Sequence, residues 1–144
     1  MLEMKVLGVT VDQSGGFSVL LSDAGEKMVL PIGIGPFEAQ AIAFPLHGET
    51  PPRPLTHDLI KSICQSLDVT LTKVVITNIK EGVFYAEIYL QHKDSPIVID
   101  ARPSDAIALA LRYGSPIYVV PKLVEFTYRY EDIIAPGQGS GDTN

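Results

Sequence analysis

Three charged side chains lie within five residues of each other in this chain: Asp100, Arg102 and Asp105. They belong to the segment V-I-D-A-R-P-S-D-A-I-A-L-A-L-R, residues 98–112, in which a β-branched run precedes Pro103. Proline suits the first helical position, since its missing N–H would have had no partner there. The segment therefore predicts a strand-to-helix corner flanked by two carboxylates and a guanidinium. Such a corner could hold a divalent cation and a phosphate oxygen together.

A plainer interpretation of the same corner stays open. Asp105 would be the third residue of the helix, where a carboxylate accepts free backbone N–H groups and interacts favourably with the helix dipole. Asp100 would then pair with Arg102 or Arg112. Because structural ion-pair networks are common, the sequence alone favours this interpretation over a catalytic one.

Two other places carry groups capable of chemistry. Arg53, His57 and Asp58 surround the predicted start of another helix, and His57 could accept or donate a proton near neutral pH. A histidine at a helix start also commonly sits in solvent without a role. Glu38, near the start of an earlier helix, is interpreted first as a cap and second as a ligand.

Glycines at 33 and 35 directly precede that earlier helix. A phosphate-binding loop places glycines in this way, with N–H groups aimed at an anion. No lysine follows and there is no three-glycine fingerprint, so a tight turn is the preferred interpretation.

Residues 36–44 and 103–111 share a proline, an acid at the third position and alternating alanines, 67 residues apart. Each is preceded by three strand-like runs. The pattern predicts two βββα units, at about residues 4–47 and 72–114, although alanine-rich helices can resemble each other by chance. The expected fold class is α+β: duplicated βββα units forming a mainly antiparallel sheet packed against alanine-rich helices, with Glu38 and Asp105 at equivalent helix starts.

Periodicity and turn residues place the remaining elements within one domain, residues 1–135. The segment 106–111 is apolar on every face and should be buried, whereas the helix at 57–67, capped by Thr56, should bury only one side. A glycine-rich polar tail, 136–144, has nothing to bury and should be disordered. The expected strands are 4–11, 17–21, 27–32, 74–77 in a segment beginning near 69, 83–91, 96–99 and 116–120, and the expected helices are 36–46, 57–67, 103–112 and 121–126.

The bulk properties limit the function classes. A net charge of −6 argues against a protein that coats nucleic acid through a basic face, but it permits an enzyme that holds phosphates locally with arginines and a metal. The single cysteine, Cys64, allows no internal disulfide and fits a reducing compartment. No segment is long and apolar enough to span a bilayer, and the first residues lack the order of a signal peptide, so we expect a cytoplasmic protein.

Three separated motifs together resemble the bifunctional nuclease domain family. They are P-I-G-I-G-P-F-E-A-Q-A-I-A (31–43), P-R-P-L-T-H-D-L (52–59) and D-A-R-P-S-D-A-I-A-L-A-L-R (100–112), and with the strands between them they cover residues 4–126. The family often has a bulky residue where this chain has Gly33. Plant members are described as cutting both DNA and RNA.

The resemblance implies a nuclease that hydrolyses phosphodiester bonds in DNA or RNA, assisted by Mg²⁺ or Mn²⁺. Carboxylates would bind the metal or activate water, arginines would bind phosphate, and a histidine would carry a proton. An alternative of the same fold is a non-catalytic ligand-binding or regulatory module. The residues that would serve the nuclease are Asp100 and Asp105 for metal and water, Glu38 in support, Arg102, Arg112 and Arg53 for phosphate, and His57 for the proton.

The predicted hairpin strand at 83–91 is long, and Tyr85 and Tyr89 share its polar side. Such a strand can pair with a second chain if its edge is free. The sequence therefore also predicts a homodimer.

Overall fold

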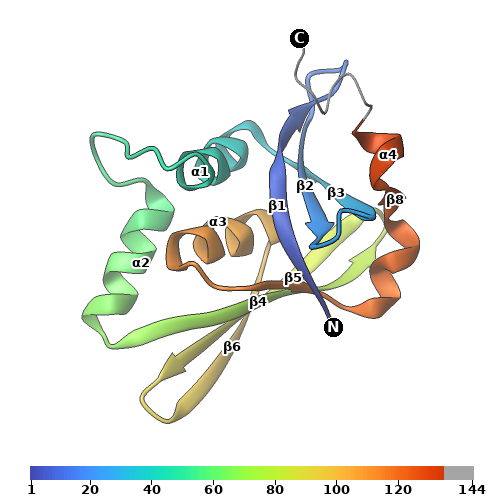
Figure 1. Ribbon diagram of the computed structural model, residues 1–144. Helices are drawn as coiled ribbons and strands as arrows, with labels where there is room; N and C mark the ends of the chain where they lie inside the picture. Colours follow the sequence, from blue (N-terminus) through green and yellow to red (C-terminus); the bar gives the residue numbers. More distant parts are fainter. Residues whose placement is uncertain (135–144) are drawn as a thin grey trace.

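Eight segments rich in β-branched and aromatic residues pair into one mixed sheet in the computed structural model, which describes residues 1–134 (Figure 1). Neighbouring strands are antiparallel except β4 and β7, which run parallel. The sheet order is β6-β5-β4-β7-β1-β2-β3-β8. The strands are β1 (Leu2–Val11), β2 (Phe17–Asp23), β3 (Met28–Ile34), β4 (Val69–Lys80), β5 (Val83–His92), β6 (Ser95–Ala101), β7 (Ile117–Val119) and β8 (Tyr128–Arg129).

Proline at the first helical position marks the start of several helices. This holds for α1 (Pro36–Leu46), α3 (Pro103–Tyr113) and the short 3₁₀ helix η1 (Pro121–Phe126). Gly114 ends α3 with a positive φ of 66°, a conformation that costs glycine little. The remaining helices are α2 (Thr56–Ser66) and α4 (Tyr130–Ile133).

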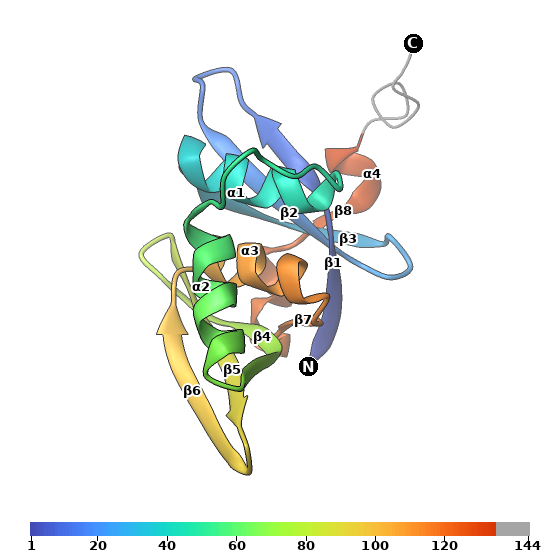
Figure 2. The same ribbon diagram turned by 90° about the vertical axis from the view of Figure 1, so that its left-hand side faces the viewer.

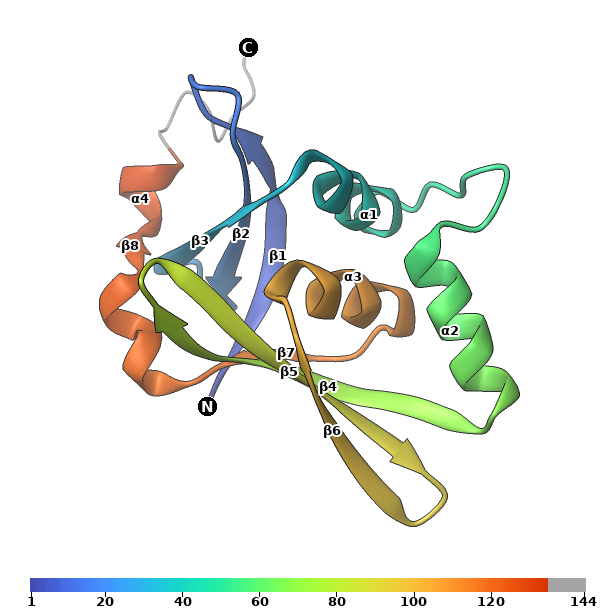
Figure 3. The ribbon, with the colours of Figure 1, turned by 180° about the vertical axis from the view of Figure 1, so that it is seen from behind.

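Two units of three strands and a helix repeat the same order, β1-β2-β3-α1 and β4-β5-β6-α3. Helix α1 contacts β1 and β2, α3 contacts β4 and β5, and the two helices lie against each other (Figures 2 and 3). Strand β7 joins the two halves of the sheet between β4 and β1. The α+β class and the mainly antiparallel sheet are thus confirmed, while a duplication as the origin of the two units stays a prediction.

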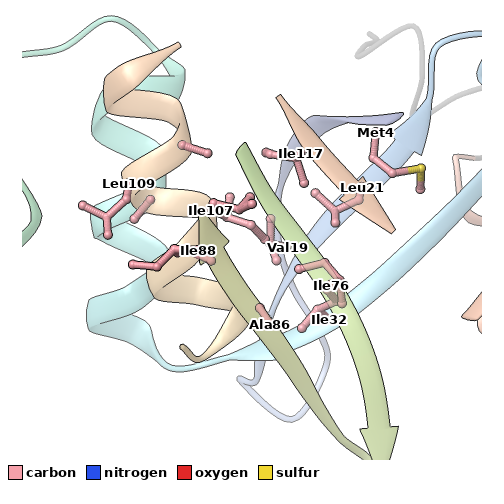
Figure 4. Packing of buried hydrophobic residues seen from close by; sticks show 14 of the residues in the cluster. Met4, Val19, Leu21, Ile32, Ile76, Ala86, Ile88, Ile107, Leu109 and Ile117 are labelled. Carbon is pink, nitrogen blue, oxygen red and sulfur yellow. The ribbon is translucent and has the colours of Figure 1, made fainter. Parts of the chain in front are cut away.

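The core lies between α3 and both halves of the sheet (Figure 4). Ile107 of α3 is fully buried, as are Val19 of β2 and Ile76 of β4. Ala106, Ala108 and Ala110 are also fully buried, which confirms that α3 is enclosed on nearly all sides. Small side chains at these positions allow neighbouring backbones to approach α3 closely.

Helix α2 is amphipathic, but its orientation differs from the expected one. Its apolar side is exposed: Leu59, Ile63 and Leu67 keep more than half of their surface. The side turned to α3 carries His57 and Lys61, because both find hydrogen-bond acceptors there. Thr56 is the first helical residue rather than the cap, and Leu55 precedes it in extended conformation.

The predicted tail, residues 136–144, lies outside the described residues. Of the helices within residues 1–134, none combines the length and the apolar character needed to cross a membrane.

Candidate functional site

A groove of about 640 Å³ opens where the starts of α1, α2 and α3 meet the end of β6. Each helix contributes one ionisable side chain: Glu38 from α1, His57 from α2 and Asp105 from α3. Arg102, the residue before α3, also lines the groove. The two prolines that begin α1 and α3 set Glu38 and Asp105 at the third helical position, near the positive ends of the helix dipoles.

These four side chains form one hydrogen-bonded network. Asp105 Oδ1 lies 2.8 Å from His57 Nε2, and Asp105 Oδ2 accepts a bond of 3.1 Å from Arg102 Nε. A terminal nitrogen of Arg102 donates to Glu38 Oε2 at 3.3 Å. The network therefore links the three helices, and its members come from parts of the chain up to 67 residues apart. It brings Glu38 and Asp105 together, as their equivalent positions in the two units predict.

The carboxyl of Asp105 is held ionised. Burial by itself raises the pKa of Asp105, but hydrogen bonds from His57 and Arg102 outweigh that effect and leave the pKa below its ordinary value. The same bond to Asp105, with a further contribution from Glu38, raises the pKa of Arg102. Since Nε2 of His57 faces a carboxylate, Nδ1 is the ring nitrogen left for another partner, and it has none within residues 1–134.

Asp100 stands apart from this network. In the register of the sheet it lies opposite Glu87, whereas Ile99 lies opposite Ile88 and Ala101 opposite Ala86. Successive side chains of a strand alternate between faces, so Asp100 belongs to the face that carries Glu87, away from buried Ala86 and Ile88. It contributes to the rim of the groove but forms no ion pair in the described part of the chain.

Two predicted phosphate ligands lie elsewhere. The side chain of Arg112 is only 5% exposed; its Nε bonds Asp58 at 2.6 Å, and one terminal nitrogen donates to the carbonyls of Ala41 and Ala108. Through these hydrogen bonds Arg112 joins α1, α2 and α3. It does so at a place outside the groove. Arg53 is exposed on the segment between α1 and α2.

The side chains of the groove that could bind a metal ion are not arranged as a preformed metal site. Both oxygens of Asp105 are engaged by His57 and Arg102, and Asp100 faces away from them. Among residues 1–134, no three side chains of His, Cys, Asp and Glu are grouped closely enough to bind a metal ion.

Sequence reasoning missed the partners of Arg112 and one aromatic side chain. Asp58 lies at the predicted helix start. Its Oδ2 accepts the Leu55 N–H at 2.8 Å, and its Oδ1 accepts a hydrogen bond from Arg112. Phe37, on the rim of the groove, is 81% exposed. For Asp58, the available signal was an acid at the third position of α2. For Phe37 there was no signal, because spacing alone does not distinguish an exposed phenylalanine from a buried one.

The model of the bifunctional nuclease domain matches residues 19–129, a segment that includes all three helices of the groove. The chain therefore belongs to the bifunctional nuclease domain family.

Relatives fall into two groups. An uncharacterized protein of Mycobacterium tuberculosis is 47% identical over 118 residues, which cover 81% of this chain and 70% of that protein. The rice protein named bifunctional nuclease 1, from Oryza sativa subsp. japonica, is 28% identical over 104 residues, 70% of this chain but 31% of the rice protein. A bifunctional nuclease of Oryza minuta matches to the same extent.

The different surroundings of Arg112 and Arg102 predict different effects on stability. Arg112→Met should lower the free energy of unfolding by about 3 kcal/mol, because it leaves two carbonyls and Asp58 without their donor. Arg102→Met, at a side chain 66% exposed directly before the same helix, should cost less than about 1 kcal/mol. Urea denaturation of both variants measures the difference, and equal losses would contradict the assigned roles.

The lowered pKa of Asp105 predicts a pH-dependent contribution to stability. A carboxyl whose folded pKa lies below its unfolded value stabilises the fold above the unfolded pKa of about 3.9, and this contribution disappears as the pH falls through the folded pKa. Asp105→Asn should therefore lower the urea midpoint at pH 7 and lower it less near pH 3. Asp100→Asn, which removes no ion pair in the described residues, is the control. A deficit in Asp105→Asn that is the same at both pH values would refute this.

Proposed function

We propose that this protein is a nuclease that hydrolyses phosphodiester bonds in DNA, RNA or both. The observation that carries the proposal is the His57–Asp105–Arg102–Glu38 network in an open groove of a bifunctional nuclease domain. A His–Asp pair supplies a proton acceptor held in one tautomer, and an exposed arginine supplies a phosphate ligand. The rice relative named bifunctional nuclease 1 supports the substrate class.

In the proposed reaction, water attacks the phosphorus atom and the bond to the leaving oxygen breaks. His57 accepts a proton from the attacking water at Nδ1, while Asp105 holds Nε2 and stabilises the imidazolium that forms. The proton then passes to the leaving oxygen, so that neutral imidazole is restored. Arg102 donates to the non-bridging phosphate oxygens, where negative charge grows in the transition state, and Glu38 positions the guanidinium.

One exposed guanidinium gives a phosphate a place to bind on this acidic chain. The start of α3 carries the positive end of the helix dipole, and Arg102 is 66% exposed beside it. Glu38 and Asp105 already balance the charge of Arg102, and the whole chain carries a charge of −6. A phosphate therefore binds here by replacing a carboxylate as the partner of Arg102. Weak, salt-sensitive association with the polymer is the expected consequence.

Assistance by Mg²⁺ or Mn²⁺, with Asp100 and Asp105 as ligands, remains a separate proposal. The carboxylates of Asp100 and Asp105 do not point to a common position. The steps above therefore use only side chains of this protein. If the phosphate oxygens of the substrate bring a cation with them, a chelator should reduce cleavage.

A second candidate is a ligand-binding or regulatory module without turnover. The contacts of the groove also have a structural role, which favours this candidate. His57 links α2 to α3, and Arg102 links α1 to the start of α3. Cleavage assays separate the two candidates. We also propose a cytoplasmic location, with which the single cysteine, Cys64, is compatible.

Cleavage of labelled single-stranded RNA and DNA by the purified full chain tests the nuclease proposal. His57→Ala should lower the rate by about 100-fold or more, as expected for loss of a general base, and Asp105→Asn should also lower it. His47→Ala, an exposed histidine outside the groove, should leave the rate unchanged. Cleavage that survives in His57→Ala would remove the proposal.

The same cleavage assay, with a chelator added, tests the metal proposal. Treatment with EDTA should stop cleavage, and added Mg²⁺ or Mn²⁺ should restore it, if the metal proposal holds. Unchanged cleavage in EDTA would reject the metal and leave the side-chain reaction in place.

We also propose that the protein is a homodimer in which β6 and the apolar side of α2 meet a second copy. Strand β5, which carries Tyr85 and Tyr89, is enclosed by β4 and β6 and has no free edge, so the predicted surface is replaced by these two elements. Strand β6 is an edge strand, and its Ile97, Val98 and Ile99 are all exposed. Exposed apolar edges of this kind favour strand pairing, and such an edge can pair with its own copy.

Light scattering tests the dimer. The mass should be twice that of the chain, and Val98→Lys should reduce it to that of one chain, because a charge at an edge strand opposes pairing. Tyr85→Lys on β5 is the control. A wild-type mass of one chain would refute the dimer.

A further inference from the structure

A second hollow, of about 430 Å³, lies on the other side of the Arg102–Glu38 pair. Both side chains line this hollow as well as the groove, so the two spaces are neighbours. Its walls come from β2 and β3, from the turn between β4 and β5, and from the start of α3. The volume falls within the range of small-molecule sites.

One end of the hollow is suited to an anion. Ser104, the second residue of α3, lines it and is only 6% exposed, yet its hydroxyl has no hydrogen-bond partner within residues 1–134. The backbone N–H groups of Ser104 and Asp105 belong to the first turn of the helix, where no carbonyl of the helix can accept them. These donors and Arg102 lie together at the positive end of α3.

The other walls are apolar. Phe17 of β2 and Phe84 of β5 both line the hollow and are half-buried, and Ile34 of β3 lies beside Phe17 in the sheet. Phe84 also packs against the core, but both rings keep part of their surface accessible, and accessible aromatic rings offer stacking surfaces to nucleobases. The hollow thus combines anion donors and flat apolar rings within the dimensions of one nucleotide.

We infer that this hollow is a subsite for one nucleotide of a single-stranded nucleic acid, adjacent to the bond that is cleaved. Ser104 and Arg102 bind its phosphate, and Phe17 and Phe84 contact its base. The inference rests on the proposed nuclease function, because Arg102 then lies between two successive phosphates of one strand. Stacking on a side chain needs a base that is free of its own stack, so the subsite favours single strands over a duplex, and it does not distinguish strongly between bases.

Fluorescence anisotropy tests the subsite in isolation from cleavage. The probe is a labelled single-stranded hexathymidylate with phosphorothioate linkages, which resist hydrolysis. Ser104→Ala should weaken its binding to the full chain about tenfold, as loss of a hydrogen bond to a charged group implies. Phe84→Ala should weaken it about fivefold or more.

Matched controls come from the neighbouring residues. Tyr85→Ala alters an aromatic residue next to Phe84 on the opposite face of β5, and Ser18→Ala alters a serine next to Phe17. Both should bind the probe as the wild-type chain does. Circular dichroism melting of each variant separates a lost contact from a lost fold.

The outcomes distinguish this inference from the nuclease proposal. Weakened binding in Ser104→Ala and Phe84→Ala supports the subsite even where no cleavage is observed. Wild-type affinity in both variants, or no binding by the wild-type chain, overturns it even where His57→Ala abolishes cleavage. Competition by inorganic phosphate as effective as that by thymidine 5′-monophosphate would reduce the hollow to an anion site and overturn the base contact.

Discussion

Close packing of α1 against α3 is the constraint on which the site depends. Both helices carry alanines where they meet the core, and Ala41, Ala106 and Ala110 are buried. Larger side chains there would push the helices apart, since protein interiors have little free volume. With the helices in contact, Arg102 at the start of one reaches Glu38 at the start of the other. The chemistry of the groove is therefore a consequence of small side chains some distance away from it.

Two arginines at opposite ends of α3, Arg102 directly before it and Arg112 in its last turn, have different tasks. Arg112 is buried and fixes the C-terminal end of α3 to α2 and α1 through Asp58 and a carbonyl of α1. Arg102 is largely exposed and shares its donors between two carboxylates. A buried arginine with several fixed acceptors serves rigidity, whereas an exposed arginine with long hydrogen bonds can exchange a carboxylate for a phosphate. Rigid support beneath an adaptable phosphate ligand is a suitable arrangement for catalysis.

Much of the fold could be predicted from local sequence. The prolines at 36 and 103 gave the helix starts, and Gly114 gave the end of α3. Alternation identified the strands of both units, and the apolar segment 106–111 predicted a buried helix. These features depend on neighbouring residues, so spacing along the chain reveals them.

Long-range partners could not be predicted in the same way. The amphipathic pattern of α2 says which residues share a side but not which side turns inward, and here the polar side meets α3 because Asp105 and the Arg112 carbonyl lie there. Arg112 and Asp58, 54 residues apart, likewise find each other only in three dimensions. Asp100 lines the same groove as Asp105, as their proximity in sequence suggests, but it lies outside the hydrogen-bonded network because alternation along β6 places its side chain on the face of Glu87.

On this proposal, a nucleic-acid phosphate binds beside His57. The chain has three histidines, at 47, 57 and 92, so their imidazole resonances can be assigned individually by NMR. Titration with a phosphorothioate single-stranded oligonucleotide should shift the resonances of His57 in a saturable manner and leave those of His47 and His92 unchanged. Unchanged His57 resonances at saturating oligonucleotide would contradict the account.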